Sequence, residues 1–159
     1  MKLLSYIITI DSGLAPNPFS KYCTLALCIP NHKNALLNNG DWILGLSSKD
    51  NGNKLIYFMK LTEEPMQRNI YFKDKRFDYK RPFFSNDRNT LVGDNIYYLE
   101  NGKYKMEGIK GFHSTETQNN QDTKYNKVFI SDYFFYFGNK SFNLEDKFKE
   151  FIWKRQNYK

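Results

Sequence analysis

A carboxylate beside a rigid loop is the first candidate for chemistry. Asp11 ends an apolar run and precedes a loop that Pro16 and Pro18 hold extended. A carboxylate at the end of a strand can accept hydrogen bonds from a base edge or a ribose, and the amide of Asn17 could read the same polar edge. The alternative is a turn in which Asp11 bonds its own backbone.

The turn Gly40-Asp41-Trp42 is the second candidate. Gly40 suits a positive φ, and the side chain of Asp41 can cap the turn. Trp42 then begins a strand at the end of a sheet, where an indole can stack on a nucleobase. A tryptophan buried in the core is the alternative for Trp42.

An aromatic strand between Ser131 and Gly138 is the third candidate. Side chains alternate between the two faces of a strand, so we expect one set of rings in the core and the other toward a groove. The two sets are Tyr133, Phe135 and Phe137, and Phe134 and Tyr136. The candidates for stacking on a base are Phe134, Tyr136 and, from another segment, Tyr97. The basic residues that follow and could contact phosphate are Lys140, Lys147, Lys154 and Arg155.

Signatures of catalysis are weak in this chain. The glycine-rich patterns of nucleotide-binding loops are absent from the sequence, and no serine lies in a nucleophile-elbow pattern. His113, in a polar loop, could be a general base or a phosphate contact, although a lone loop histidine is more often solvated. The spacing of Cys23 and Cys28 is not that of zinc ligands. We therefore predict no catalytic residue, no metal and no cofactor.

The composition favours a folded, strand-rich domain. The 159 residues fit one domain, and a hydrophobic content of 40% with 14 Phe and 12 Tyr suits sheet packing. The formal charge of +7 favours polyanionic partners such as nucleic acid, although a Lys- and Asn-rich chain also follows from an AT-rich genome. The sequence shows neither a signal peptide nor a run long enough to span a membrane, so we expect a soluble, cytoplasmic protein without a membrane partner.

The elements that must position these residues are mostly strands. The segment 3–10 reads as a central strand, because its apolar character is nearly continuous, and 22–29 is either a strand or a buried helix. Asn51-Gly52 predicts a hairpin between the strands at 41–46 and 54–61. The further strands are predicted at 95–99, 103–106 and 127–137, the helices at 31–37, within 63–77 and at 144–153, and a polar loop at 113–126.

Several blocks of the chain resemble the nucleotide modification associated domain 2 family. The most specific is Asp-Ser-Gly-Leu-Ala-Pro-Asn-Pro-Phe at 11–19; others are 23–30, Gly-Asp-Trp-Ile-Leu-Gly at 40–45, Gly-Asp-Asn-Ile-Tyr-Tyr at 93–98, and 128–138. The resemblance covers most of the chain. It implies association with systems that modify bases in DNA, including those of phages and mobile elements, and it carries over no catalytic residues.

The order of elements is also loosely similar to that of PUA-like domains, the EVE, YTH and ASCH groups. The similarity rests on a strand, a connection, a short helix and then Gly-Asp at the start of a strand. It implies a small, partly closed β-barrel that holds a modified base in an aromatic pocket. The expected fold is therefore α+β, with a mixed, barrel-like sheet, short helices and a C-terminal amphipathic helix.

Binding of a nucleotide or modified nucleobase, free or in nucleic acid, is the leading hypothesis for function. In it, Trp42 and other rings stack on the base and Asp11 and Asn17 read its edge. One rival is an enzyme with Asp11, Asp41 and His113 as acid, base or metal ligands. Another is a module whose exposed rings dock on a partner protein. The sequence fixes neither the ligand nor the oligomeric state.

Overall fold

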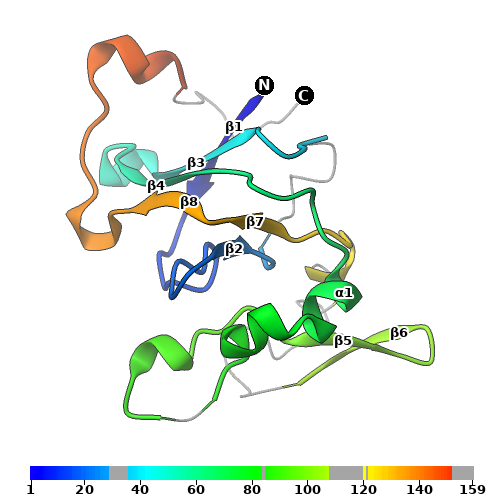
Figure 1. Cartoon of the computed structure of the whole chain (residues 1–159). Coiled ribbons are helices and arrows are strands. Elements are labelled where there is room, and N and C mark those ends of the chain that lie inside the picture. Colours follow the sequence, from blue (N-terminus) through cyan, green and yellow to red (C-terminus); the bar gives the residue numbers. More distant parts are fainter. Residues whose placement is uncertain (29–35, 84, 108–119, 121, 152–159) are drawn as a thin grey trace.

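The computed structural model describes residues 1–28, 36–83, 85–107, 120 and 122–151, with the side chains of 149–151 excepted. The chain combines short strands with few helices, which confirms the predicted α+β class. Figure 1 shows a four-stranded sheet above a two-stranded pair, with a helix and a hairpin below.

The main sheet has the strand order β1-β3-β4-β8. Its strands are β1 (Leu3–Ile8), β3 (Trp42–Ser47), β4 (Leu55–Lys60) and β8 (Tyr133–Tyr136). β1 pairs with β3 in parallel, whereas β3 with β4 and β4 with β8 pair antiparallel. The predicted hairpin between β3 and β4 is confirmed, and Gly52 takes a φ of 87° in its turn.

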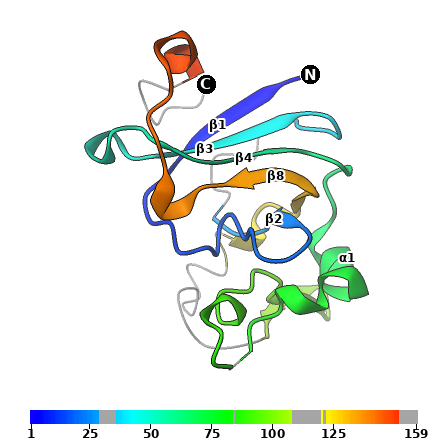
Figure 2. The same ribbon diagram turned by 60° about the vertical axis from the view of Figure 1, so that its left-hand side comes forward.

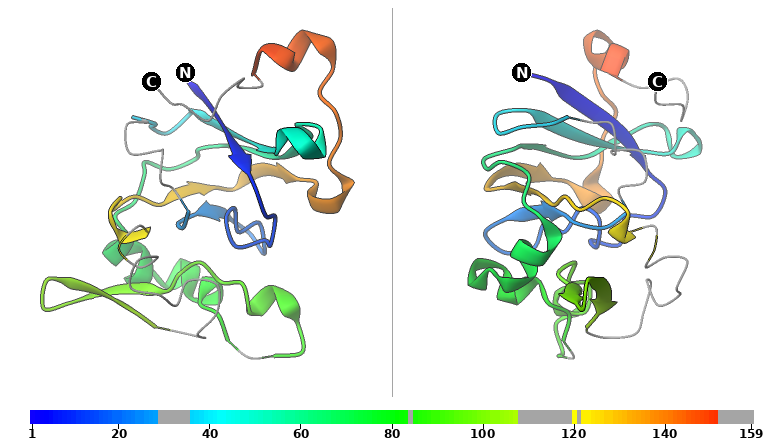
Figure 3. Two further views of the ribbon diagram at one scale, coloured as in Figure 1. Left: turned by 180° about the vertical axis from the view of Figure 1, so that it is seen from behind. Right: turned by 90° about the vertical axis from the view of Figure 1, so that its right-hand side faces the viewer.

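Two smaller antiparallel pairs complete the strands of the described chain. β2 (Cys23–Leu25) pairs with β7 (Phe129–Ser131), and β5 (Tyr97–Glu100) pairs with β6 (Lys103–Met106). Figures 2 and 3 show the β2–β7 pair between the main sheet and the part that contains β5 and β6. These strands form three separate sheets and no closed barrel, so the expected PUA-like closure is not confirmed.

The helices are short. The predicted helix within 63–77 is present as α1 (Arg68–Lys73), and the predicted amphipathic helix at 144–153 is replaced, over its described residues, by one 3₁₀ segment, η6 (Asp146–Phe151). The predicted helix at 31–37 lies mainly outside the described residues. Among the helices that are described, none has the length and apolar character needed to cross a bilayer. The other 3₁₀ segments are η2 (Lys49–Asn51), η3 (Lys75–Lys80), η4 (Arg88–Thr90) and η5 (Gly138–Lys140).

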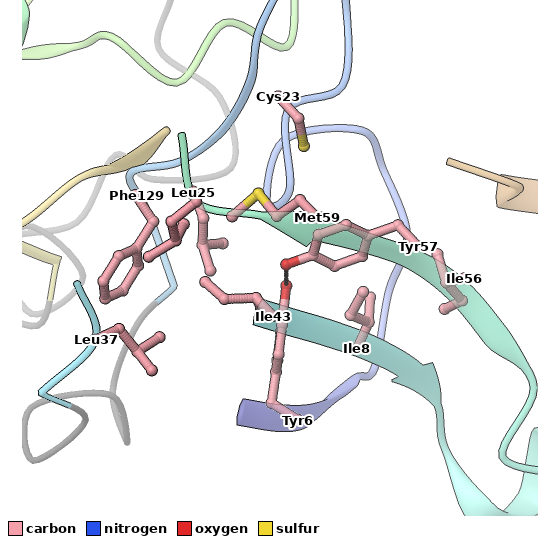
Figure 4. Packing of buried hydrophobic residues seen from close by; sticks show 11 residues of the cluster. Tyr6, Ile8, Cys23, Leu25, Leu37, Ile43, Ile56, Tyr57, Met59 and Phe129 are labelled. Carbon is pink, nitrogen blue, oxygen red and sulfur yellow. Dashed lines mark hydrogen bonds between the residues drawn. The ribbon is translucent and has the colours of Figure 1, made fainter. Parts of the chain in front are cut away.

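Two hydrophobic clusters hold the sheets together. The first fills the space between the inner face of the main sheet and the β2–β7 pair. Figure 4 shows its centre, where the hydroxyls of Tyr6 and Tyr57 share a hydrogen bond of 2.9 Å and so satisfy each other inside the core. The second cluster joins β2 and β7 to α1, η3 and β5, through residues such as Leu27, Tyr71, Phe77 and Ile130.

The predicted strand at 127–137 is in fact two strands in different sheets. β7 pairs with β2 and ends at Ser131, and β8 pairs with β4 and begins at Tyr133. The hydroxyl of Ser131 donates to the carbonyl of Lys60 at 2.6 Å and accepts from the backbone N–H of Tyr133 at 3.0 Å. These bonds hold the bend that lets one segment change sheets, and such corners are typical where packed sheets share a strand.

β1 is an edge strand, and the prediction of a central position is wrong. Among the described strands it has one neighbour, β3. Its apolar character comes from burial rather than from two pairing partners: Tyr6 and Ile8 lie in the first cluster, and Leu4 packs against it. A short, nearly continuous apolar run reports burial of the side chains and not the position of the strand in a sheet.

Candidate functional site

The outer face of the main sheet carries a connected group of aromatic rings. Strand alternation sends Tyr57 and Met59 into the core, so Phe58 and Lys60 lie on the opposite face of β4. The register then places Phe135 opposite Phe58. We call this group the outer aromatic face; it consists of Trp42, Phe58, Tyr133, Phe135, Phe137 and Phe142.

The rings of the outer aromatic face contact one another in a chain. Phe58 stacks on Phe135 with a centroid distance of 5.0 Å and an interplanar angle of 28°. Trp42 lies 6.0 Å from Phe58 and 5.9 Å from Tyr133. Phe137 connects Phe58, at 6.2 Å, to Phe142, at 4.9 Å. These contacts limit the movement of the rings, so a planar ligand meets a surface that is already organised.

Solvent reaches much of this surface. Tyr133 is 51% exposed, Phe135 48% and Phe142 46%, whereas Trp42 and Phe58 are half-buried. A group of exposed rings is unusual on the surface of a protein, so this face is a candidate interaction site. Of the two sets predicted for the aromatic strand, the structure therefore places Tyr133, Phe135 and Phe137 outward, and Phe134 and Tyr136 pack against the core.

A lysine lies within the aromatic group. Lys60 is the cross-strand partner of Trp42 on one side and of Tyr133 on the other. Its side chain is exposed, and in the described part of the chain it forms no ion pair. A cation between two rings suits a ligand that has both an aromatic base and a phosphate.

Asp11 lies at the other end of the sheet from Trp42. In the parallel pairing of β1 and β3, Leu3 is opposite Trp42 and Ile8 is opposite Ser47. Asp11 comes shortly after Ile8, beyond the end of β1 that is away from Trp42. The two residues therefore do not form the single cleft in which we expected Asp11 to read a base that Trp42 stacks on. Asp41 precedes Trp42, so the acid–base or metal set of Asp11 with Asp41 is separated in the same way.

A shallow depression surrounds Asp11. Both carboxylate oxygens of Asp11 accept hydrogen bonds from the Tyr136 hydroxyl, at 2.9 Å each, and burial together with this carboxylate raises the pKa of Tyr136. The depression has a volume of about 700 Å³. Its polar lining residues include Asp11, Ser47, Asp50, Asn51, Lys54 and Asn139.

Asp41 has a structural role in the described geometry. It is buried, and its carboxylate accepts hydrogen bonds from the backbone N–H groups of Lys2, at 2.6 Å, and of Asn38, at 3.0 Å. These two bonds, that of Asn38 first, lower the pKa of Asp41. The predicted capping of the turn is therefore confirmed, and the carboxylate also fixes the chain that enters β1.

Acid should weaken this anchor in the wild type more than in an Asp41→Asn variant. The lowered pKa of Asp41 means that its contribution to stability is complete above the unfolded value of about 3.9 and is lost as the pH falls through the folded value. We expect the variant to be about 2 kcal/mol less stable at pH 7 and the difference to shrink below pH 4. Urea unfolding at several pH values measures it, and a difference that stays constant down to pH 2 would contradict this role.

Asn17 is buried within the loop and does not present its amide to a ligand. Its Nδ2 donates to the carbonyl of Val92 at 2.7 Å, and its Oδ1 accepts from the Lys80 ammonium at 2.6 Å. The same ammonium donates to the carbonyls of Asn17, Phe19 and Tyr22. Burial lowers the pKa of Lys80 to about 8, and the negative charge of Asp94 opposes this shift. Lys80 thus holds the C-terminal end of the loop 11–19 and the residues that follow it.

A buried carboxylate lies near Lys80. Asp94 accepts hydrogen bonds from the hydroxyls of Thr24 and Tyr71, at 2.7 Å each, and burial raises its pKa. Cys23 is fully buried nearby, and burial raises the pKa of its thiol. Cys28, by contrast, is exposed.

Tyr97 does not join the outer aromatic face. Tyr97 is buried; its hydroxyl donates to Asp122 at 3.0 Å, and the Arg68 guanidinium lies 5.5 Å from its ring. His113 lies outside the described residues, so its predicted role stays a prediction. Within the described chain, no three His, Cys, Asp or Glu side chains are grouped as a metal ion would require.

Sequence reasoning found Trp42 but missed Phe58 and Phe142 as members of the same surface. Phe58 lies within the predicted strand at 54–61, and Phe142 lies outside every predicted strand and helix. The available signal was the alternation of Phe58 with Tyr57 and Met59, but which face is solvated depends on what packs against the sheet.

The comparisons with known proteins give one match. A family model described as nucleotide modification associated domain 2 matches residues 1–159. No curated protein and no solved structure matches the chain.

Proposed function

The chain belongs to the nucleotide modification associated domain 2 family, and from this premise we propose that it binds nucleobases through its outer aromatic face. Family membership implies a role associated with nucleotide modification. The finer proposal is that the protein is a reader or accessory that holds a nucleotide or a modified base. The observation that carries it is the contiguous group of exposed rings around Lys60.

Stacking on such rings gives useful affinity without a deep pocket. A base stacked on an aromatic side chain contributes about 1–3 kcal/mol, and every base has a face that can stack. Phe135 offers an exposed ring backed by Phe58, so it is the best-placed platform. Lys60 supplies a positive charge beside Trp42 and Tyr133, where a phosphate attached to the base would lie.

The PUA-like arrangement and the modified-base specificity belong to this proposal as well. The mixed order of β1, β3 and β4 and the Gly40-Asp41 turn support the first. The depression next to Asp11 supports the second through its chemistry: its carboxylates can accept hydrogen bonds from substituents on a base, and its amides can both donate and accept them.

Removal of a stacking ring should weaken binding and leave the fold intact. We expect Phe135→Ala and Trp42→Ala each to reduce affinity for a fluorescein-labelled oligodeoxynucleotide about tenfold, measured by anisotropy. Phe83→Ala is the matched control for Phe135→Ala, because Phe83 is 51% exposed, close to the 48% of Phe135, but lies outside the outer aromatic face. Circular dichroism verifies folding.

Wild-type affinity in a folded Phe135→Ala variant would remove the outer aromatic face from the binding site. Loss of self-association in that variant, without any change in nucleic-acid binding, would assign the face to protein docking instead.

A further inference from the structure

We propose that the ligand of the outer aromatic face is single-stranded nucleic acid spanning at least three nucleotides, rather than a free nucleotide. This inference rests on the proposed function and names its ligand class. Three observations support it: the size of the ring group, the need for a base whose face is free to stack on these rings, and the positions of two lysines.

The ring group is larger than one base can cover. From Trp42 the contacts lead through Phe58 and Phe137 to Phe142 in centroid steps of 6.0, 6.2 and 4.9 Å. Each step is longer than the rise of about 3.4 Å per nucleotide in a stacked strand. A single base therefore contacts one or two of the rings and leaves the others exposed, whereas successive bases of a strand can cover them all.

A single strand fits this surface better than a duplex. The rings lie on the face of a sheet, and a base can stack on them only if its own face is free. In a duplex both faces of each internal base are covered by its neighbours, and removal of a base from the stack costs a few kcal/mol. Exposed rings on a sheet are the arrangement with which proteins hold successive bases of a strand.

Positive charge is present toward both ends of the ring group. Lys60 lies between Trp42 and Tyr133 at one end. Lys140 is exposed and lies in the chain between Phe137 and Phe142 at the other. A free nucleotide can meet one of these ammonium groups, whereas a strand carries a phosphate at every nucleotide and can meet both. The net charge of +7 favours the same ligand.

The test measures affinity against the length of the ligand. Isothermal titration with deoxyadenosine monophosphate and unlabelled oligodeoxyadenylates of two, four and eight nucleotides, using the full chain, should show affinity rising at least tenfold from the monophosphate to the tetranucleotide. We expect Phe142→Ala to reduce the affinity for the octanucleotide about fivefold and that for the monophosphate by a smaller factor, and Phe83→Ala, which lies outside the outer aromatic face, to change neither. A mixed-sequence duplex should bind at least tenfold more weakly than either of its separated strands of the same length.

Salt dependence gives a second readout. For a single strand, each neutralised phosphate contributes about −0.7 to the slope of log affinity against log salt concentration. Lys60→Gln and Lys140→Gln should each make the slope for the octanucleotide less steep by about this amount. A slope that neither variant changes would overturn the assignment of the two lysines to phosphates of one strand.

The possible failures are distinguishable. If the monophosphate binds as tightly as the octanucleotide and Phe135→Ala weakens both, the polymer inference is wrong and the nucleobase site stands. If the duplex binds as tightly as the single strands, the inference is wrong as well. If no ligand of any length binds to the wild type, the proposed function itself fails.

Discussion

Replacement of Lys80 by methionine is expected to lower the free energy of unfolding by about 3–5 kcal/mol, as removal of one member of a buried charged network does. The ammonium is buried, and its three N–H groups are shared among four oxygens, which are the side-chain and backbone oxygens of Asn17 and the carbonyls of Phe19 and Tyr22. Methionine has a similar volume but donates to none of them. The substitution also removes the positive charge of Lys80, which counteracts the rise that burial causes in the pKa of Asp94.

Chemical denaturation at pH 7, where the ammonium form of Lys80 prevails, measures this loss. Lys75→Met is the matched control, because Lys75 begins the same 3₁₀ segment, η3, and is exposed. We expect the control to change stability by less than about 0.5 kcal/mol. Equal denaturation midpoints for the two variants would show that the loop 11–19 is not held by Lys80.

Replacement of Gly93 by alanine is the second large effect that we expect, a loss of about 3 kcal/mol in the free energy of unfolding. A Cβ at this position would lie 2.2 Å from the carbonyl oxygen of Lys80 and 2.6 Å from the nitrogen of Pro82. Both are backbone atoms, so no side-chain rotation relieves the overlap. The backbone N–H of Asn95 also donates to the carbonyl of Lys80 at 3.1 Å, and this bond would be stretched.

Gly102→Ala separates steric overlap from backbone freedom. Gly102 has a φ of 75°, which disfavours alanine, but no atom lies within 4 Å of its added Cβ. We expect this variant to lose about 1 kcal/mol, measured by thermal or urea unfolding beside Gly93→Ala. A Gly93→Ala variant as stable as Gly102→Ala would mean that the strands and loops around Lys80 and Pro82 separate easily.

Much of the local structure could be predicted from the sequence. The strands β1, β3, β4, β5 and β6 lie within a few residues of their predicted bounds, because β-forming residues are concentrated there and Asn-Gly turns separate β3 from β4 and β5 from β6. The cap formed by Asp41 was equally predictable, since short carboxylates commonly bond the backbone of turns. These features depend on interactions between neighbours in the chain.

The arrangement of the strands was not predictable in the same way. The bend at Asp132 is marked only by the polar pair Ser131-Asp132, because apolar residues precede it, aromatic residues follow it, and neither Gly nor Pro interrupts them. The separation of Asp11 from Trp42 follows from the parallel pairing of β1 with β3, which joins segments about forty residues apart. Likewise, Asn17 has the residue type of a ligand contact, and only its burial against Lys80 shows that it organises the loop.

The hydrogen bond between Tyr136 and Asp11 also bears on the pairing register of β8. Positions 133–137 are aromatic throughout, so a slip of one residue would exchange one set of rings for the other with little change in hydrophobic burial. Hydrogen bonds of polar groups must therefore make one of the two registers more stable than the other. The Tyr136 hydroxyl on Asp11 and the Ser131 hydroxyl at the bend favour the observed alignment from opposite ends of the strand, and in this alignment Phe134 and Tyr136 pack against the core while Phe135 faces the solvent.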